Sequence, residues 1–337
     1  MFESSGMTAV TEVSRRLNRA LLLLLAISNP ASAQSDTDDP RTWLEAMSQA
    51  MQSLNYDGTF VYLHDGKLET MRVIHRADQD GERERLIALT GVPREVLRDD
   101  NSVTCILPDQ KTVMVDKSLP RKPFPASLPR DLAALQSNYH FRLAGDDRIT
   151  GRDAKIIEIY PRDEYRYGYR LWIDKAYKVL LKFDLIDPHG KALEQTMFTQ
   201  LDLPTRISDK ALEAGISGEG YTWHGDVRRA SSDATPADGT DWKLDWLPRG
   251  FMLTHHSRHQ MPVRRGSAEH MVYSDGLATV SVYFEKLVPG KEILQGVSNM
   301  GTVNAMGGVV DGFHATVVGE VPAVTVEQIG KGISLRR

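Results

Sequence analysis

The chain has 337 residues, of which 41% are hydrophobic and 26% charged, and its formal net charge is −4 at pH 7. This composition is typical of a globular protein, and so mild a negative charge argues against a nucleic-acid partner. The length predicts two domains, each long enough to bury a core of its own.

Residues 1–33 are predicted to be a cleaved signal peptide. A basic region at 15–19 precedes the apolar run Ala20–Ile27, and Ala31-Ser32-Ala33 is a small-residue cleavage site. A membrane anchor is the alternative, but the apolar run is shorter than the roughly 20 residues that span a bilayer. Met7 is an alternative start. We therefore expect an exported, soluble protein of the periplasm that begins at Gln34.

The first domain, predicted at 34–207, opens with a helix and continues in strands. Asp39 is a suitable N-cap and Pro40 a suitable first residue, and apolar residues follow at helical spacing. Short β-branched and aromatic runs between Asp, Gly, Asn and Pro then predict antiparallel strands. These strands are expected over residues 59–64, 68–76, 84–90, 94–98, 102–107 and 111–116.

Residues 118–129 interrupt this pattern. Four prolines surround Phe124 and Leu128, and because proline removes ladder donors, we expect a long loop that crosses the sheet without joining it. Strands are then predicted over residues 139–144, 154–160, 165–174, 178–187 and 192–203. Consecutive apolar residues at 179–181 indicate a stretch that is covered on both faces.

Residues 208–241 lose periodicity and are rich in Gly, Ser and Ala, so we interpret them as a linker. The smaller second domain, 242–337, is predicted to be mostly β. Its strands are expected over residues 251–256, 268–274, 278–285, 315–319 and 324–328, with a short helix after Pro322 as an alternative at the last position. The fold class is α+β and mostly β: a curved antiparallel sheet with a packed helix, followed by a smaller domain.

Several motifs resemble a known family. Tyr56-Asp57-Gly58-Thr59-Phe60-Val61-Tyr62 follows the first helix, and residues 169–174 and 185–190 close the first sheet. Trp246-Leu247-Pro248-Arg249-Gly250-Phe251 and residues 270–278 mark the second domain. The first half resembles the lipoprotein-carrier fold of LolA and LolB. From Asp39 onward the chain resembles the RseB/MucB family, which joins such a domain to a smaller one.

The resemblance implies regulation by binding. Members of this family bind the periplasmic domain of a membrane-spanning anti-sigma factor (RseA/MucA type) and shield it from the site-1 protease (DegS/AlgW type). Lipopolysaccharide or another lipid, together with misfolded outer-membrane protein, releases the block during envelope stress. A lipid that prefers the partner-free form must weaken partner binding by the same factor. The oligomeric state is left open, a homo-oligomer included.

The residues themselves carry no catalytic motif that we recognise. Gly-x-Ser-x-Gly, His-Glu-x-x-His and a phosphate-binding Gly-Lys-Ser/Thr are all missing from the sequence. We therefore predict a protein that is not an enzyme and uses no cofactor. A periplasmic hydrolase would need a nucleophile and a base that we do not find. A lipoprotein or lipid carrier is the other alternative, but a carrier needs only the first domain.

A segment of the second domain is rich in histidine and arginine. Imidazoles along a strand can converge on a metal ion, but no cysteine or carboxylate completes a set here and Arg258 would repel a cation. We predict no metal, and interpret the segment as an exposed basic face for an acidic peptide or a lipid phosphate, with plain solvated surface as the alternative. Its members are His255, His256, Arg258, His259, Arg264 and Arg265.

Large apolar side chains of the first domain are candidates for lipid contact. Ordinary core is the alternative, yet a curved sheet covered by a proline-rich loop forms an acyl-chain cavity, because the loop can lift without breaking strand pairing. The candidates are Phe60, Tyr62, Phe124, Leu128 and Trp172. In the second domain we interpret the Gly-rich stretch 300–308, with its two methionines, as a loop or an adaptable contact surface.

Overall fold

The computed structural model describes residues 39–116, 128, 132–224, 235–236, 241–260, 267–288, 290 and 292–336. The predicted signal peptide lies outside these residues, as do most of the predicted loop 118–129 and the side chains of Phe124, Arg264 and Arg265. Within the described ranges, no helix has the length and apolar character that a membrane crossing requires.

The first helix begins where the sequence predicts it. Helix α1 spans Pro40–Ser53, and the Asp39 carboxylate accepts a hydrogen bond of 2.9 Å from the backbone N–H of Arg41. The Arg41 guanidinium hydrogen-bonded to this carboxylate also lowers the pKa of Asp39. The apolar face of the helix joins the core of the large sheet through Trp43, Leu44, Met47, Ala50 and Met51.

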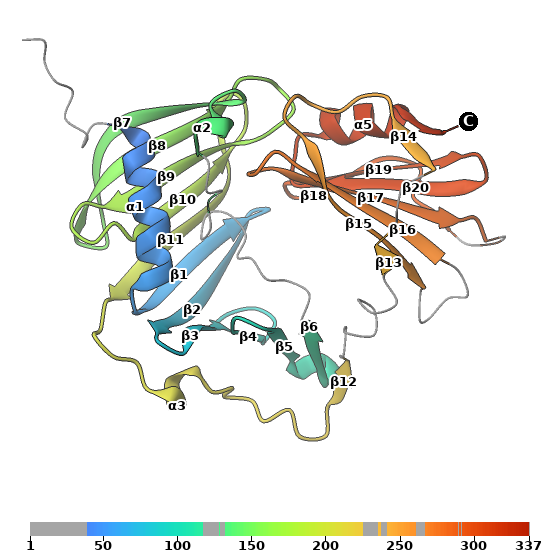
Figure 1. The fold of residues 1–337 in the computed structure, drawn as a ribbon. Coiled ribbons are helices and arrows are strands. Elements are labelled where there is room, and N and C mark those ends of the chain that lie inside the picture. The colour runs from blue at the N-terminus through green and yellow to red at the C-terminus, as the bar shows by residue number, and fades with distance from the viewer. Residues whose placement is uncertain are drawn as a thin grey trace, which may run out of the picture. The chain divides into compact units, whose positions relative to one another are not determined.

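In the described part of the chain, twelve strands form the large sheet, in the order β12-β6-β5-β4-β3-β2-β1-β11-β10-β9-β8-β7. Figure 1 shows α1 lying across one face of this sheet. Neighbouring strands are antiparallel, except that β12 pairs with β6 in parallel. The strands are β1 (Tyr56–His64), β2 (Lys67–Asp78), β3 (Gly81–Ala88), β4 (Glu95–Arg98), β5 (Val103–Leu107), β6 (Thr112–Asp116), β7 (Tyr139–Ile149), β8 (Arg152–Pro161), β9 (Gly168–Asp174), β10 (Leu180–Ile186), β11 (Ala192–Asp202) and β12 (Thr222–His224).

The predicted strands of the first domain are confirmed, with one correction. The strand predicted over 165–174 is wrong at its start, because β9 begins at Gly168 and residues 162–167 form a connecting segment. Short helical turns lie at Pro108–Gln110, Leu132–Leu135 (α2) and Asp209–Leu212 (α3). The last of these, together with β12, folds within the predicted linker 208–241.

The second sheet contains seven strands among the residues described, in the order β13-β15-β16-β17-β20-β19-β18. Helix α5 (Ala323–Lys331) packs on β19 and β20, and a two-stranded sheet pairs β14 (Trp242–Leu244) with β21 (Ile333–Leu335). The strands are β13 (Thr235–Pro236), β15 (Met252–Gln260), β16 (Ser267–Ser274), β17 (Thr279–Lys286), β18 (Gly296–Met300), β19 (Val303–Val310) and β20 (Phe313–Gly319). The α+β, mostly β fold class is confirmed.

Two predictions for the second domain need correction. Residues 324–328 form helix α5 and not a strand, because Val326 and Ile329, three positions apart, are both fully buried. This is the short helix expected as the alternative after Pro322. Most of the Gly-rich stretch forms β19 and is not a loop, and Gly307 allows the segment before β18 to approach this strand closely. A Cβ on Gly307 would lie 2.2 Å from the backbone oxygen of Leu294.

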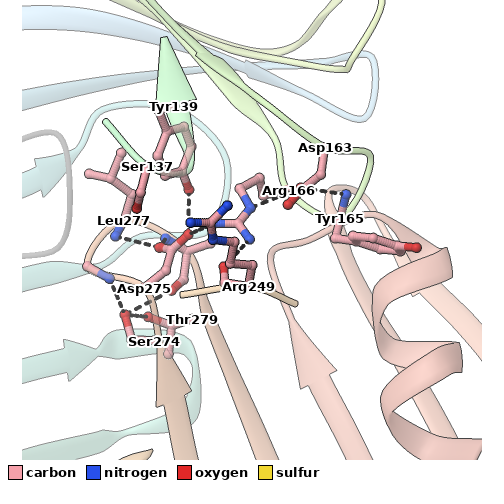
Figure 2. A network of polar contacts seen from close by, with 12 residues as sticks. Ser137, Tyr139, Asp163, Tyr165, Arg166, Arg249, Ser274, Asp275, Leu277 and Thr279 are labelled. Carbon is pink, nitrogen blue, oxygen red and sulfur yellow. Dashed lines mark hydrogen bonds and ion pairs between the residues drawn. The ribbon is translucent and has the colours of Figure 1, made fainter. Parts of the chain in front are cut away.

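The segment between β8 and β9 contacts the second domain through a buried ion pair (Figure 2). Arg166 and Asp275 form this pair, and both side chains have an exposed fraction of 0%. The guanidinium also donates to Asp163 Oδ1 at 3.0 Å and to the backbone oxygen of Arg249 at 2.7 Å. The Tyr139 hydroxyl donates to Asp275 Oδ2 at 2.9 Å. Both charges are therefore compensated away from water.

Tyr165 and Tyr167, the neighbours of Arg166, also contact the second domain. Thr325 Oγ1 donates to the backbone oxygen of Tyr165 at 2.7 Å, and the Tyr165 ring packs edge-on against Trp246 with centroids 4.8 Å apart. Asn304 Nδ2 donates to the Tyr167 hydroxyl at 3.2 Å. Residues 165–167 thus join the first domain to four segments of the second: the entry segment 246–249, the β16–β17 turn, β19 and α5.

We expect Arg166→Met to lower the free energy of unfolding by about 3–5 kcal/mol, because it leaves a buried carboxylate without its cation. Urea unfolding followed by tryptophan fluorescence measures this loss. Adding Asp275→Asn to the same chain should cost much less than the sum of the two single changes, because the second change removes the uncompensated charge.

The matched control is Lys331→Met, which breaks the exposed pair between Lys331 and Glu327 on α5. It should leave the unfolding midpoint nearly unchanged, because exposed ion pairs contribute little. Equal midpoints for the Arg166 and Lys331 variants would contradict a structural role for the buried pair.

Candidate functional site

A cavity of about 490 Å³ lies between the large sheet and the β16–β17 turn. The large sheet contributes aromatic and aliphatic side chains and one carboxylate. The second domain contributes the turn and a second carboxylate. The lining residues are Tyr62, Tyr169, Phe183, Leu185, Glu194, Leu277, Ala278, Thr279 and Glu320.

Strand register explains why these residues of the large sheet share one face. Residues that are paired across antiparallel strands point to the same side. Glu194 pairs with Leu185, and Leu185 pairs with Tyr169, so the three form a row across β11, β10 and β9. Tyr62 and Phe183 each pair with Thr196 and form the next row of the same face.

The opposite wall is held by Asp275. Its Oδ1 accepts hydrogen bonds from the backbone N–H groups of Leu277 at 2.9 Å and Ala278 at 2.8 Å, while Oδ2 accepts from Arg166 and Tyr139. Because one carboxylate shapes the turn and binds the buried arginine, the ion pair positions this wall of the cavity.

Two carboxylates meet at the polar end of the cavity. Glu194 Oε2 accepts from the Tyr62 hydroxyl at 2.5 Å, and Glu194 Oε1 accepts from Thr302 Oγ1 at 2.6 Å. Thr302 Oγ1 also lies 3.2 Å from Glu320 Oε1. A hydroxyl carries a single proton, so Thr302 can donate to only one of the two carboxylates at a time.

The surroundings of these groups disfavour further negative charge. Removal from water, and then the hydrogen bond to Glu194, raise the pKa of Tyr62. Removal from water and the charge of Glu194 raise the pKa of Glu320, although its side chain is still exposed at the mouth of the cavity. Among the described residues, no Lys, Arg or His nitrogen lies within 4.0 Å of either carboxylate.

The predicted lipid-contact residues do not all share a face. Phe60 and Tyr62 lie on the cavity side of β1, where Phe60 packs edge-on against Phe198 with centroids 5.7 Å apart. Trp172 lies on the opposite side, because it pairs with Lys182, whose Nζ is 3.9 Å from the indole centroid. Leu128 packs against the core of the first domain. Phe124 lies outside the described residues.

The predicted basic residues of β15 are also divided between two faces. His255 Nε2 is 3.1 Å from Ser257 Oγ on one face. On the other face, His256 Nε2 lies 2.7 Å from Glu269 Oε1 and Arg258 Nε donates to Glu269 Oε2 at 3.3 Å. Glu269 thus balances part of the predicted positive charge. The side chains of His259, Arg264 and Arg265 lie outside the described residues.

Sequence reasoning missed the residues that form the polar end of the cavity. Glu194, Thr302 and Glu320 lie in no motif, and each resembles an ordinary polar residue of a strand or turn. The alternation along β11 indicates which residues share a face with Glu194, but only the register shows that Tyr62 faces it. In the described part of the chain, no group of three or more His, Cys, Asp or Glu residues is placed to hold a metal ion.

Two family models match the chain. The MucB/RseB N-terminal domain matches residues 39–216, and the MucB/RseB C-terminal domain matches residues 236–334. Among curated relatives, the sigma factor AlgU regulatory protein MucB of Pseudomonas aeruginosa is 33% identical over 93% of this chain and 96% of its own length. The sigma-E factor regulatory protein RseB of Escherichia coli is 27% identical, over 86% of this chain and 89% of its own.

Solved structures give the same result. The structure of MucB in complex with MucA(peri) is similar to this chain with a TM-score of 0.69 and 30% identity, covering 89% of this chain and 100% of that one. A structure of MucB alone has a TM-score of 0.60 at 30% identity, covering 88% of this chain and 98% of the other. Since the family models match both of its domains and relatives align over nearly its whole length, the chain belongs to the MucB/RseB family of sigma-factor regulatory proteins.

Proposed function

We propose that this protein is a periplasmic negative regulator that binds the periplasmic part of a membrane-spanning anti-sigma factor and shields it from site-1 proteolysis. The observation that carries this proposal is the likeness to MucB in complex with MucA(peri), which extends over both domains. The predicted signal peptide at 1–33, with cleavage after Ala33, supports the periplasmic location.

Release by lipid is the second half of the proposal. Lipopolysaccharide or another amphiphile binds the first domain beneath the loop 118–129 and lowers the affinity for the anti-sigma factor. Burying each acyl methylene contributes about 0.8 kcal/mol, so a few of them supply the roughly 1–3 kcal/mol of coupling that a useful switch needs. Leu128 packs against the core of the first domain, which supports a lipid site beside that core.

The regulator should slow site-1 cleavage of the anti-sigma factor. The test reconstitutes three purified components, namely this protein, the cognate anti-sigma factor's periplasmic segment and the site-1 protease, and follows cleavage by gel. At saturating regulator the cleavage rate should fall several-fold, because a bound segment is not accessible to the protease.

A second substrate of the same protease, unrelated to the anti-sigma factor, serves as the control. Its cleavage should be unaffected, which separates shielding of the substrate from inhibition of the protease. An unchanged cleavage rate for the anti-sigma segment at saturating regulator would rule out the shielding function.

The double substitution Phe124→Ser and Leu128→Ser should weaken lipid binding and leave the thermal transition nearly unchanged if these residues lie in a lid. If they are ordinary core, the melting temperature should fall sharply, because apolar contacts are lost. Lipid titration by intrinsic fluorescence, with thermal melts of the same samples, separates the two outcomes. The matched control is Leu68→Ser with Val92→Ser, two exposed apolar residues of the same domain.

Reversing charge with Arg264→Glu and Arg265→Glu should weaken binding of the anti-sigma segment more at low salt than at high salt. Attraction between exposed charges is screened within about 8 Å at physiological ionic strength. Fluorescence anisotropy at two salt concentrations measures the difference, and Arg206→Glu with Lys210→Glu, two exposed residues outside the basic segment, is the control. An affinity that does not respond to the reversal or to salt indicates that the basic segment is plain solvated surface.

A further inference from the structure

We propose that the cavity beside Glu194 and Glu320 is a receptor site for one basic side chain, an arginine or a lysine, of a partner protein. The assignment rests on the proposed function only for the identity of that partner. The cavity's lining, its charge and the two domains that build it support the site itself.

The charge of the cavity lacks a counter-ion within the described residues. Glu194 and Glu320 lie close enough for one hydroxyl, that of Thr302, to contact both, at 2.6 and 3.2 Å. Their hydrogen-bond donors are hydroxyl groups, which are neutral and satisfy only part of what two carboxylates can accept. A cation placed between them would gain two charge-assisted hydrogen bonds and relieve the repulsion of like charges.

The apolar and aromatic part of the lining indicates which kind of cation fits the cavity. Tyr169 and Phe183 stack with ring centroids 5.8 Å apart, and Leu185 and Leu277 complete an apolar wall. Lysine and arginine carry an aliphatic stem that packs on apolar surface and a charged head that favours aromatic faces. The cavity of about 490 Å³ has room for such a side chain, with an apolar wall for the stem and two carboxylates for the head.

Other ligand classes fit less well. Ca²⁺ takes six to eight oxygen ligands, and Mg²⁺ demands near-ideal octahedral geometry. Here two carboxylates and two hydroxyls face each other, and one wall is apolar. The phosphates of an anionic lipid would be repelled by both carboxylates. A basic side chain therefore fits the lining and the charge together.

The first experiment uses hexylguanidinium as a probe, because it reproduces an arginine head on an apolar stem. Isothermal titration of the full chain should show saturable binding to one site. Hexanol and hexanoate should bind at least about tenfold more weakly, because they lack the charge or carry the wrong one.

The double substitution Glu194→Gln and Glu320→Gln should weaken hexylguanidinium binding about tenfold or more, because it keeps the shape and removes both charges. The matched control, Glu213→Gln with Glu219→Gln, removes two exposed carboxylates that do not line the cavity and should bind the probe like the parent chain. Thermal melts of both variants show whether either has lost its fold, and proton resonances of Tyr169 and Phe183 report the cavity directly.

Three results would overturn the assignment. The first is no saturable binding of hexylguanidinium to the parent chain, or equal binding to the Glu194 and Glu320 double variant. The second is equal binding of hexanol, which would make the cavity merely apolar. The third is stoichiometric Ca²⁺ binding that depends on both glutamates and excludes the probe, which would make it a metal site.

Binding of the proposed partner is measured in a separate experiment with the anti-sigma factor's periplasmic segment. We expect hexylguanidinium to compete with the segment, and the double variant to bind the segment about tenfold more weakly than the control variant. Equal affinity of the segment for both variants would overturn the partner assignment. Failure of the segment to bind the parent chain would defeat the proposed function, and the probe titration alone would then decide the cavity.

Discussion

The buried charge of Arg166 is the constraint on which the junction of the two domains depends. Moving a guanidinium out of water costs several kcal/mol, and only well-placed partners offset that cost. Arg166 has an exposed fraction of 0%, and its partners come from separate segments: Asp275, Asp163 and the backbone oxygen of Arg249. The rings of Tyr139 and Phe251 lie 5.4 and 5.2 Å from its guanidinium carbon. Moving these segments apart would leave the charge without its partners, so the ion pair holds the β16–β17 turn where it forms the cavity wall.

Patterns among neighbouring residues made most of the fold predictable. The segments that were predicted wrongly are those in which such patterns are weak. The Asp39-Pro40 cap and the period-2 alternation of the strands are properties of neighbouring residues, so α1 and the hairpins were accessible from the sequence. The stretch from 300 to 312 was not, because glycine has a low strand propensity and its use here depends on a distant contact with Leu294. Residues 324–328 form a short apolar run of the kind that fits a strand as well as a helix.

The candidate site was less accessible, because it depends on register and on distant pairs. Residue type alone suggested Trp172 for the lipid face, yet a shift of one position along β9, from Leu171 to Trp172, reverses the direction of the side chain. The same alternation separates His255 from His256 along β15. Glu194 and Thr302 are 108 positions apart, and no pattern within either segment signals that they meet.

Tyr62 connects the two ligands that are proposed for this protein. It lies in the row of cavity-facing residues, and its hydroxyl donates to Glu194, so it helps to hold one of the two carboxylates. It is also one of the side chains proposed to contact lipid. An acyl chain that displaced the Tyr62 ring would remove a donor from Glu194 and change the site for a basic side chain. Linkage then requires that the basic side chain, once bound, change lipid binding by the same factor. A single side chain shared by two sites is therefore enough to couple lipid binding to partner binding, without any long-range rearrangement of either sheet.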